Sequence, residues 1–116
     1  MALTKRELAA LRAGDPQLDL MLDAIAAGLV QLARPNRSAL DLVDRYFCQW
    51  DAADLALVFQ EDPWSWAGKL HYWDLGDSEG YAAWQCDGLD SPPPELEVLR
   101  LRVRYFQRKR SKSGTS

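Results

Sequence analysis

The residue with the clearest catalytic potential is His71, the single histidine of the 116-residue chain. Imidazole titrates near neutral pH, so a triad or a histidine general base would have to use His71. Asp74 and Asp77 follow it closely. However, the sequence around His71 predicts a strand, on which His71 and Asp74 point to opposite faces. We therefore interpret His71 as a half-covered strand residue and predict no catalytic residue.

The carboxylates and cysteines form no recognisable site pattern either. Acidic pairs such as Glu61 and Asp62 are typical of helix caps and of solvated surface charge. A structural zinc site needs about four cysteine or histidine ligands in close pairs. This chain has two cysteines and one histidine, and Cys48 and Cys86 are far apart. We predict two buried, reduced thiols, no metal and no cofactor.

The segment DPWSWAGKLHYW, residues 62–73, has the most unusual composition of the chain. Tryptophan and tyrosine dominate the hot spots of protein interfaces, although they also fill the core of a small domain. On a strand, Trp66 and Trp73 cannot both point inward with Tyr72 unless a bend intervenes. We therefore expect at least one exposed ring and predict a partner-binding surface. Its predicted members are Trp64, Trp66, Tyr72 and Trp73.

The charges of the chain are divided unevenly. Residues 1–99 contain 7 basic and 17 acidic side chains, whereas residues 100–116 contain 7 basic side chains and no acidic one. Such a basic end could bind phosphates, with Tyr105 or Phe106 stacking on bases. It could equally bind an acidic protein or pair with the acidic helices of its own chain. The predicted binding residues here are Arg100, Arg102, Arg104, Arg108, Lys109 and Arg110.

Four helices are predicted to position these groups from the N-terminal side. The first, over 5–13, starts at a Thr-x-x-Glu capping box. The second starts at an Asp-Pro pair, repeats its apolar residues at three- and four-residue spacing, and ends near residues 34–35. The third is predicted over 38–50. The fourth is a short helix over 51–62 that ends at a second Asp-Pro pair.

Strands are predicted in the rest of the chain. Residues 69–75 and 81–86 resemble two strands joined by the glycine-bounded loop GDSEG. Residues 96–107 contain LRLRVRY, in which leucine and valine alternate strictly with arginine, as in a half-buried strand. Helical spacing of Leu96, Leu99 and Val103 favours the alternative of a helix. We prefer the strand because a helix would place Leu101 on its arginine side.

The predicted architecture is therefore α+β, with about four N-terminal helices packed on a small C-terminal antiparallel sheet of about three strands. We expect a single globular domain over residues 1–107 and a disordered basic tail over residues 108–116. The N-terminus carries charges where a signal peptide needs an apolar run, and no apolar stretch is long enough to span a bilayer. A cytoplasmic protein without a membrane segment is the expectation.

One stretch resembles a known family. Residues 42–66, LVDRYFCQWDAADLALVFQEDPWSW, are similar to the opening helix pair of the nuclear transport factor two-like superfamily. The residues that carry the resemblance are Tyr46, Phe47, Trp50, Asp54, Leu55, Phe59 and Asp62. It implies a cone-shaped α+β fold whose pocket serves small ligands, isomerase or dehydratase chemistry, or dimer formation. No position beyond Asp62 matches, so the resemblance assigns no catalytic residue.

These observations predict a small, non-enzymatic protein–protein interaction module, such as an adaptor, an inhibitor or a regulatory subunit. It would use the aromatic segment and the basic C-terminal edge, and its partner would be a protein. One alternative is a nucleic-acid-associated protein anchored by residues 100–112. A second is a small-ligand pocket or enzyme of the cone-shaped kind, with His71 or Asp62 near the pocket. A homodimer is compatible with all three.

Overall fold

The computed structural model describes residues 2–32, 34–89 and 92–114, without the side chains of 106, 107 and 109–114. Throughout these residues the regular elements are helices, and no strand occurs among them. The predicted α+β class and its C-terminal sheet are therefore wrong. In chain order the elements are α1 (Lys5–Gly14), α2 (Pro16–Gln31), α3 (Asn36–Phe47), the 3₁₀ helix η1 (Asp54–Gln60), α4 (Pro63–Leu75), α5 (Ser78–Asp87), the 3₁₀ turn η2 (Pro94–Leu96) and α6 (Glu97–Gly114).

The capping signals of the first two helices are confirmed. The Thr4 hydroxyl accepts the backbone N–H of Glu7 at 3.1 Å, and the Glu7 carboxylate accepts that of Thr4 at 3.0 Å. Asp15 caps α2 through the N–H groups of Gln17 and Leu18, and Pro16 occupies the first turn. The third predicted helix is present as α3. Only a 3₁₀ helix, η1, forms where the fourth was predicted.

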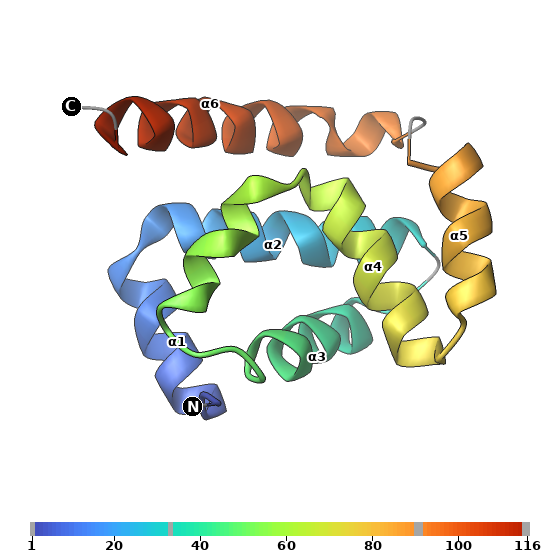
Figure 1. Cartoon of the computed structure of the whole chain (residues 1–116), viewed down its shortest axis with the longest axis horizontal. Helices are drawn as coiled ribbons and strands as arrows, with labels where there is room; N and C mark the ends of the chain where they lie inside the picture. The colour runs from blue at the N-terminus through green and yellow to red at the C-terminus, as the bar shows by residue number, and fades with distance from the viewer. Residues whose placement is uncertain (1, 33, 90–91, 115–116) are drawn as a thin grey trace.

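Helix α2 is the centre of the core. It packs against α1, α3, α4 and α6, because its apolar residues occupy most of its circumference rather than one narrow stripe. Its buried residues are Leu18, Met21, Leu22, Ala24, Ile25, Ala26, Gly28 and Leu29. Figure 1 shows α2 running through the middle of the molecule, whose principal extents are 39 × 29 × 22 Å.

Helices α2 and α4 approach each other closely at Gly28. A methyl group added there would lie 2.7 Å from the Cβ atom of Ala67, which is fixed to the α4 backbone. We expect Gly28→Ala to lower the free energy of unfolding by about 1–3 kcal/mol through overpacking, although alanine ordinarily favours a helix. Gly14→Ala is the matched control, since nothing lies within 4 Å of its added methyl group. Urea denaturation would measure both, and equal stability of the two variants would contradict this close packing.

Residues 69–75 belong to α4, so the strand predicted there is wrong. The helix starts at Asp62, whose carboxylate accepts the N–H of Trp64 at 2.9 Å, and Pro63 fills the first turn. It ends at Gly76, which has the left-handed backbone angle φ of 64° that glycine adopts most readily. The second Asp-Pro pair thus begins a helix, just as the first one does.

Residues 81–86 lie in α5, so this strand prediction is also wrong. The Asp77 carboxylate accepts the N–H of Gly80 at 2.8 Å and caps the helix. No residue of α5 is fully buried. The helix is held mainly by its packing on α4, and in Figure 1 it stands at one end of the molecule.

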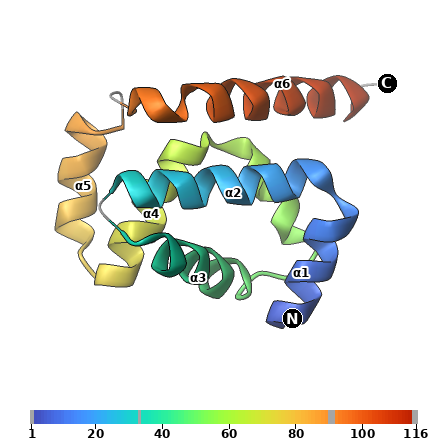
Figure 2. The ribbon, with the colours of Figure 1, turned by 180° about the vertical axis from the view of Figure 1, so that it is seen from behind.

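The helical alternative is correct for residues 96–107. Leu96 and Val103 are buried, and Leu99 packs against the core at the same helical spacing. Leu101 is 55% exposed, so the preference for a strand, which assumed that Leu101 is buried, was wrong. Helix α6 runs antiparallel to α2 along one side of the molecule (Figures 1 and 2). Its backbone is helical through Gly114, and residues 115–116 of the predicted tail lie outside the described residues.

None of the described helices combines the length and the apolar character needed to cross a membrane.

Candidate interaction surfaces

Two tryptophans of the predicted aromatic surface are core residues. Trp64 and Trp66 are each 4% exposed. The indole N–H of Trp66 donates to the Val58 carbonyl at 2.9 Å, and that of Trp64 donates to the Gly88 carbonyl at 2.7 Å. Both rings are therefore satisfied internally and offer almost no area to a partner.

The other two aromatic residues of the prediction line a cleft between α4 and α5. Trp73 is 45% exposed and Tyr72 is half-buried. The cleft has a volume of about 370 Å³. Its lining residues are Lys69, Tyr72, Trp73, Gly76, Asp77, Ser78 and Tyr81. We call this feature the α4–α5 cleft. Tyr81 had not been predicted, because residues 81–86 had been assigned to a strand.

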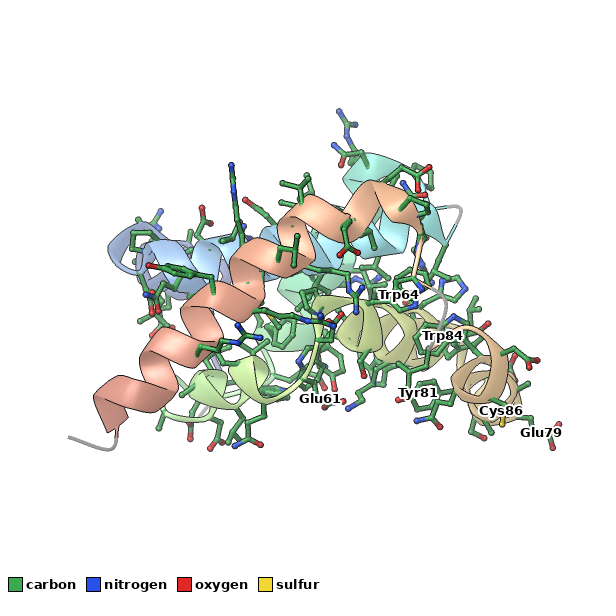
Figure 3. The ribbon with its side chains drawn as sticks, turned by 90° about the horizontal axis from the view of Figure 1, so that it is seen from above. Glu61, Trp64, Glu79, Tyr81, Trp84 and Cys86 are labelled. Carbon is green, nitrogen blue, oxygen red and sulfur yellow. The ribbon has the colours of Figure 1, made fainter. Side chains whose placement is uncertain are left out.

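Trp84 holds the two walls of the cleft together. Its ring covers Gly68, where an added methyl group would lie 2.2 Å from the ring atoms. The ring also stacks on Tyr81, with centroids 6.1 Å apart, and contacts Trp64 at 5.5 Å. Figure 3 shows Tyr81 and Trp84 on the side of α5 that faces α4, whereas Glu79 points away. The absence of a side chain at Gly68 therefore permits the docking of α5.

Three of the large apolar side chains that are exposed lie on the outer face of α6. Val98, Leu101 and Tyr105 are 65%, 55% and 61% exposed. Together with Leu20 of α2 and Arg102 they line a shallow groove of about 540 Å³. We call these five residues the α6 stripe. The stripe had not been predicted from the sequence, although Val98, Leu101 and Tyr105 have helical spacing.

The arginines of the predicted basic edge do not all point to the same side of α6. The Arg100 guanidinium lies 3.0 Å from the Asp62 carboxylate, and that of Arg104 lies 3.4 Å from the same carboxylate. Arg102 instead belongs to the exposed α6 stripe, and Arg108 is also exposed. The predicted residues Lys109 and Arg110 have side chains outside the described part of the structure. Pairing within the chain thus accounts for two of the four described arginines.

His71 and Asp74 lie on the same side of α4, because a three-residue separation on a helix brings side chains together. Arg34 joins them: its Nε donates to His71 Nδ1 at 2.9 Å, and its Nη1 donates to Asp74 at 3.0 Å. Arg45 also donates to Asp74 at 3.2 Å. Burial tends to raise the pKa of Asp74, but these hydrogen bonds outweigh it, and the net pKa is lowered. The arrangement is a polar link that joins α4 to the connection between α2 and α3 and to the last turn of α3.

The same link makes stability depend on the protonation of His71. Burial and the neighbouring Arg34 charge lower the pKa of His71 below its usual value of about 6.5. The unfolded chain therefore binds a proton first as the pH falls, so stability present above about pH 6.5 is lost below it. We expect the urea concentration at the midpoint of unfolding to decrease when the pH is lowered from about 7.5 to about 5.5. His71→Gln, which keeps an acceptor for Arg34, should remove most of this pH dependence of the urea midpoint. An unchanged pH dependence in the variant would show that His71 is not its source.

The cysteines and carboxylates offer no metal centre in the part of the chain that is described. No group of three or more histidine, cysteine, aspartate or glutamate side chains there could hold a metal ion. Both cysteines are free thiols. Cys48 is partly buried, whereas Cys86 is exposed on α5, so the prediction that both thiols are buried was wrong for Cys86.

Comparison of the chain with protein-family models, with curated proteins and with solved structures finds no match to any of them. The resemblance of residues 42–66 to the nuclear transport factor two-like superfamily stays a hypothesis. The residues that carry it lie in α3, in η1 and in the turns that follow them.

Proposed function

We propose that this protein is a non-enzymatic protein–protein interaction module that docks another protein on the α6 stripe. The observation that carries the proposal is the exposure of three large apolar side chains, Val98, Leu101 and Tyr105, on one face of a helix. Isolated exposed apolar residues are ordinary, but a contiguous apolar patch of this kind marks interaction sites.

The spacing of the stripe suits recognition by a groove. Val98, Leu101 and Tyr105 follow the i, i+3, i+7 pattern with which amphipathic helices enter apolar grooves of partner proteins. The opposite face of α6 already packs in the core through Leu99 and Val103. Val98, Leu101 and Tyr105 are therefore presented by a helix that is already docked, so their binding to a partner has a small ordering cost.

Charge favours a partner whose groove has an acidic rim. Arg102 lies within the α6 stripe and Arg108 is exposed further along the same helix. A two-fold pairing of two α6 stripes would bring the two copies of Arg102 together near the symmetry axis, where like charges repel. An acidic-rimmed groove on a different protein has no such conflict. Association with nucleic acid is less well supported, because Arg100 and Arg104 both pair with Asp62.

The test is capture of a partner from nuclease-treated native lysate, using the wild-type chain, Leu101→Asp and Leu40→Asp. Leu40 is 41% exposed on α3, which lies across the molecule from α6 (Figures 1 and 2). It therefore controls for the general effect of adding an aspartate to an exposed apolar site. Affinity for the captured protein would then be measured with each purified variant.

We expect Leu101→Asp to weaken binding by about thirtyfold or more, the effect of losing a hot spot of about 2 kcal/mol. Leu40→Asp should bind like the wild type. The proposal would be contradicted if Leu101→Asp and Tyr105→Ala both captured the same protein with unchanged affinity, or if all capture disappeared after nuclease treatment.

A further inference from the structure

We propose that the α4–α5 cleft is a second binding site, separate from the α6 stripe, and that it takes an arginine or lysine side chain from a basic segment of a partner protein. Three aromatic residues line it: Tyr72, Trp73 and Tyr81. The faces of such rings carry partial negative charge and attract guanidinium and ammonium groups. Helix α4 contributes Lys69, Tyr72 and Trp73 to the cleft. Trp73 is the most exposed of the three, at 45%.

The rings of the cleft are held in place before any ligand arrives. Tyr46 of α3 meets Trp73 edge-on, with centroids 5.1 Å apart. Tyr72 and Tyr81 lie 6.2 Å apart, and Tyr81 is in turn stacked on Trp84. A ligand would therefore lose little affinity to the ordering of these side chains.

The charge around the cleft selects a cation. Of the seven residues that line the cleft, Asp77 is the one acidic residue and Lys69 is the one basic residue. Asp77 lies in the lining itself, and the ion pairs of the described residues do not include it. An anionic ligand would meet this carboxylate without a compensating positive group. A neutral apolar ligand would leave the negative charge of Asp77 without a cationic partner, although the carboxylate would still cap α5.

Lys69 does not reverse this preference, although it also lines the cleft. Its ammonium lies 2.6 Å from the Glu61 carboxylate and 4.4 Å from the centroid of the Trp66 ring. The positive charge of Lys69 is thus compensated by the carboxylate of Glu61. Asp77 and the aromatic faces remain to determine what the cleft attracts.

The experiment uses a fluorescein-labelled peptide of alternating glycine and arginine, with a peptide of alternating glycine and glutamine as the charge control. Fluorescence anisotropy at low salt would be measured for the full chain and for Trp73→Leu, Trp73→Phe, Asp77→Asn and Leu75→Ala. Leucine keeps apolar volume at position 73 without an aromatic face, whereas phenylalanine keeps the face. Asparagine caps a helix about as well as aspartate, so Asp77→Asn removes the charge and preserves α5. Leu75 is exposed nearby but does not line the cleft.

We expect Trp73→Leu to weaken binding of the arginine peptide by about threefold to thirtyfold, the range of a cation–π contact. Trp73→Phe should recover most of this loss, Asp77→Asn should also weaken binding, and Leu75→Ala should bind like the wild type. The glutamine peptide should bind more weakly than the arginine peptide.

Three outcomes would overturn the assignment. Equal binding of the wild type and Trp73→Leu would show that the peptide is held by the general negative charge of the protein. Equal binding of the two peptides would point to a neutral occupant. The third outcome is that the arginine peptide does not bind, while sedimentation velocity shows self-association of the wild type that Trp73→Leu abolishes. This result would assign the cleft to a second copy of the chain.

Discussion

Replacing Trp66 by alanine is expected to lower the free energy of unfolding by about 3–5 kcal/mol. The Trp66 ring is 4% exposed and meets the rings of Tyr46, Phe47 and Trp50 at centroid distances of 5.6–6.3 Å. Its removal leaves a cavity where α3, α4 and the chain before η1 meet. The Val58 carbonyl also loses its hydrogen-bond donor, the indole N–H of Trp66, which lies 2.9 Å away.

The matched control is Trp73→Ala on the same helix. Trp73 is 45% exposed, and its ring meets that of Tyr46 edge-on. Its loss should cost clearly less than that of Trp66, about 1–2 kcal/mol, because the ring buries less apolar area and its pair with Tyr46 contributes about 0.5–1.5 kcal/mol. Urea denaturation followed by far-ultraviolet circular dichroism would measure both variants. Similar losses for Trp66→Ala and Trp73→Ala would contradict the division of these rings between core and surface.

The N-terminal half could be predicted from the sequence because its signals are local. The side chains of Thr4 and Asp15 cap the helices that follow them. The apolar residues of α2 recur with the helical period over four turns. Such signals depend on neighbours within a few residues, so they do not require knowledge of how the chain packs.

Residues 69–75, the second half of α4, were mistaken for a strand for a physical reason. In the first two turns of α4, buried residues occur on nearly every side, including Pro63, Trp64 and Ala67, whereas the last turn is exposed. A helix with this distribution has no apolar stripe that a periodicity argument can detect. Its aromatic residues also favour strands when they are considered one by one.

The candidate sites were located only in part for the same reason. Tyr72 and Trp73 do line the α4–α5 cleft, but the other wall comes from Tyr81, which only helix–helix packing brings near them. Leu101 had been assumed to need burial. Its exposure at 55% is what creates the α6 stripe, so the assumption that favoured a strand also concealed the surface.

Val103→Asp is the second change for which we expect a large loss of stability. Val103 is 2% exposed on the inner face of α6. The substitution gives up about 1.5–3 kcal/mol of apolar burial and places a carboxylate where water is excluded. We expect a decrease of at least about 3 kcal/mol in the free energy of unfolding. A partly undocked α6 would also appear as a lower denaturant dependence of unfolding.

Residues 97–114 form a helix that buries Val103 and leaves Leu101 exposed, where we propose that a partner binds. The most direct test of this arrangement is the thermal midpoint of Leu101→Asp beside that of Val103→Asp. On a helix these residues face different directions, whereas on a strand they share one face. We predict that Leu101→Asp changes the free energy of unfolding by no more than about 0.5 kcal/mol, as is usual for surface sites, while Val103→Asp unfolds well below the wild type. Comparable losses of stability in both variants would contradict the helix and the surface that it presents.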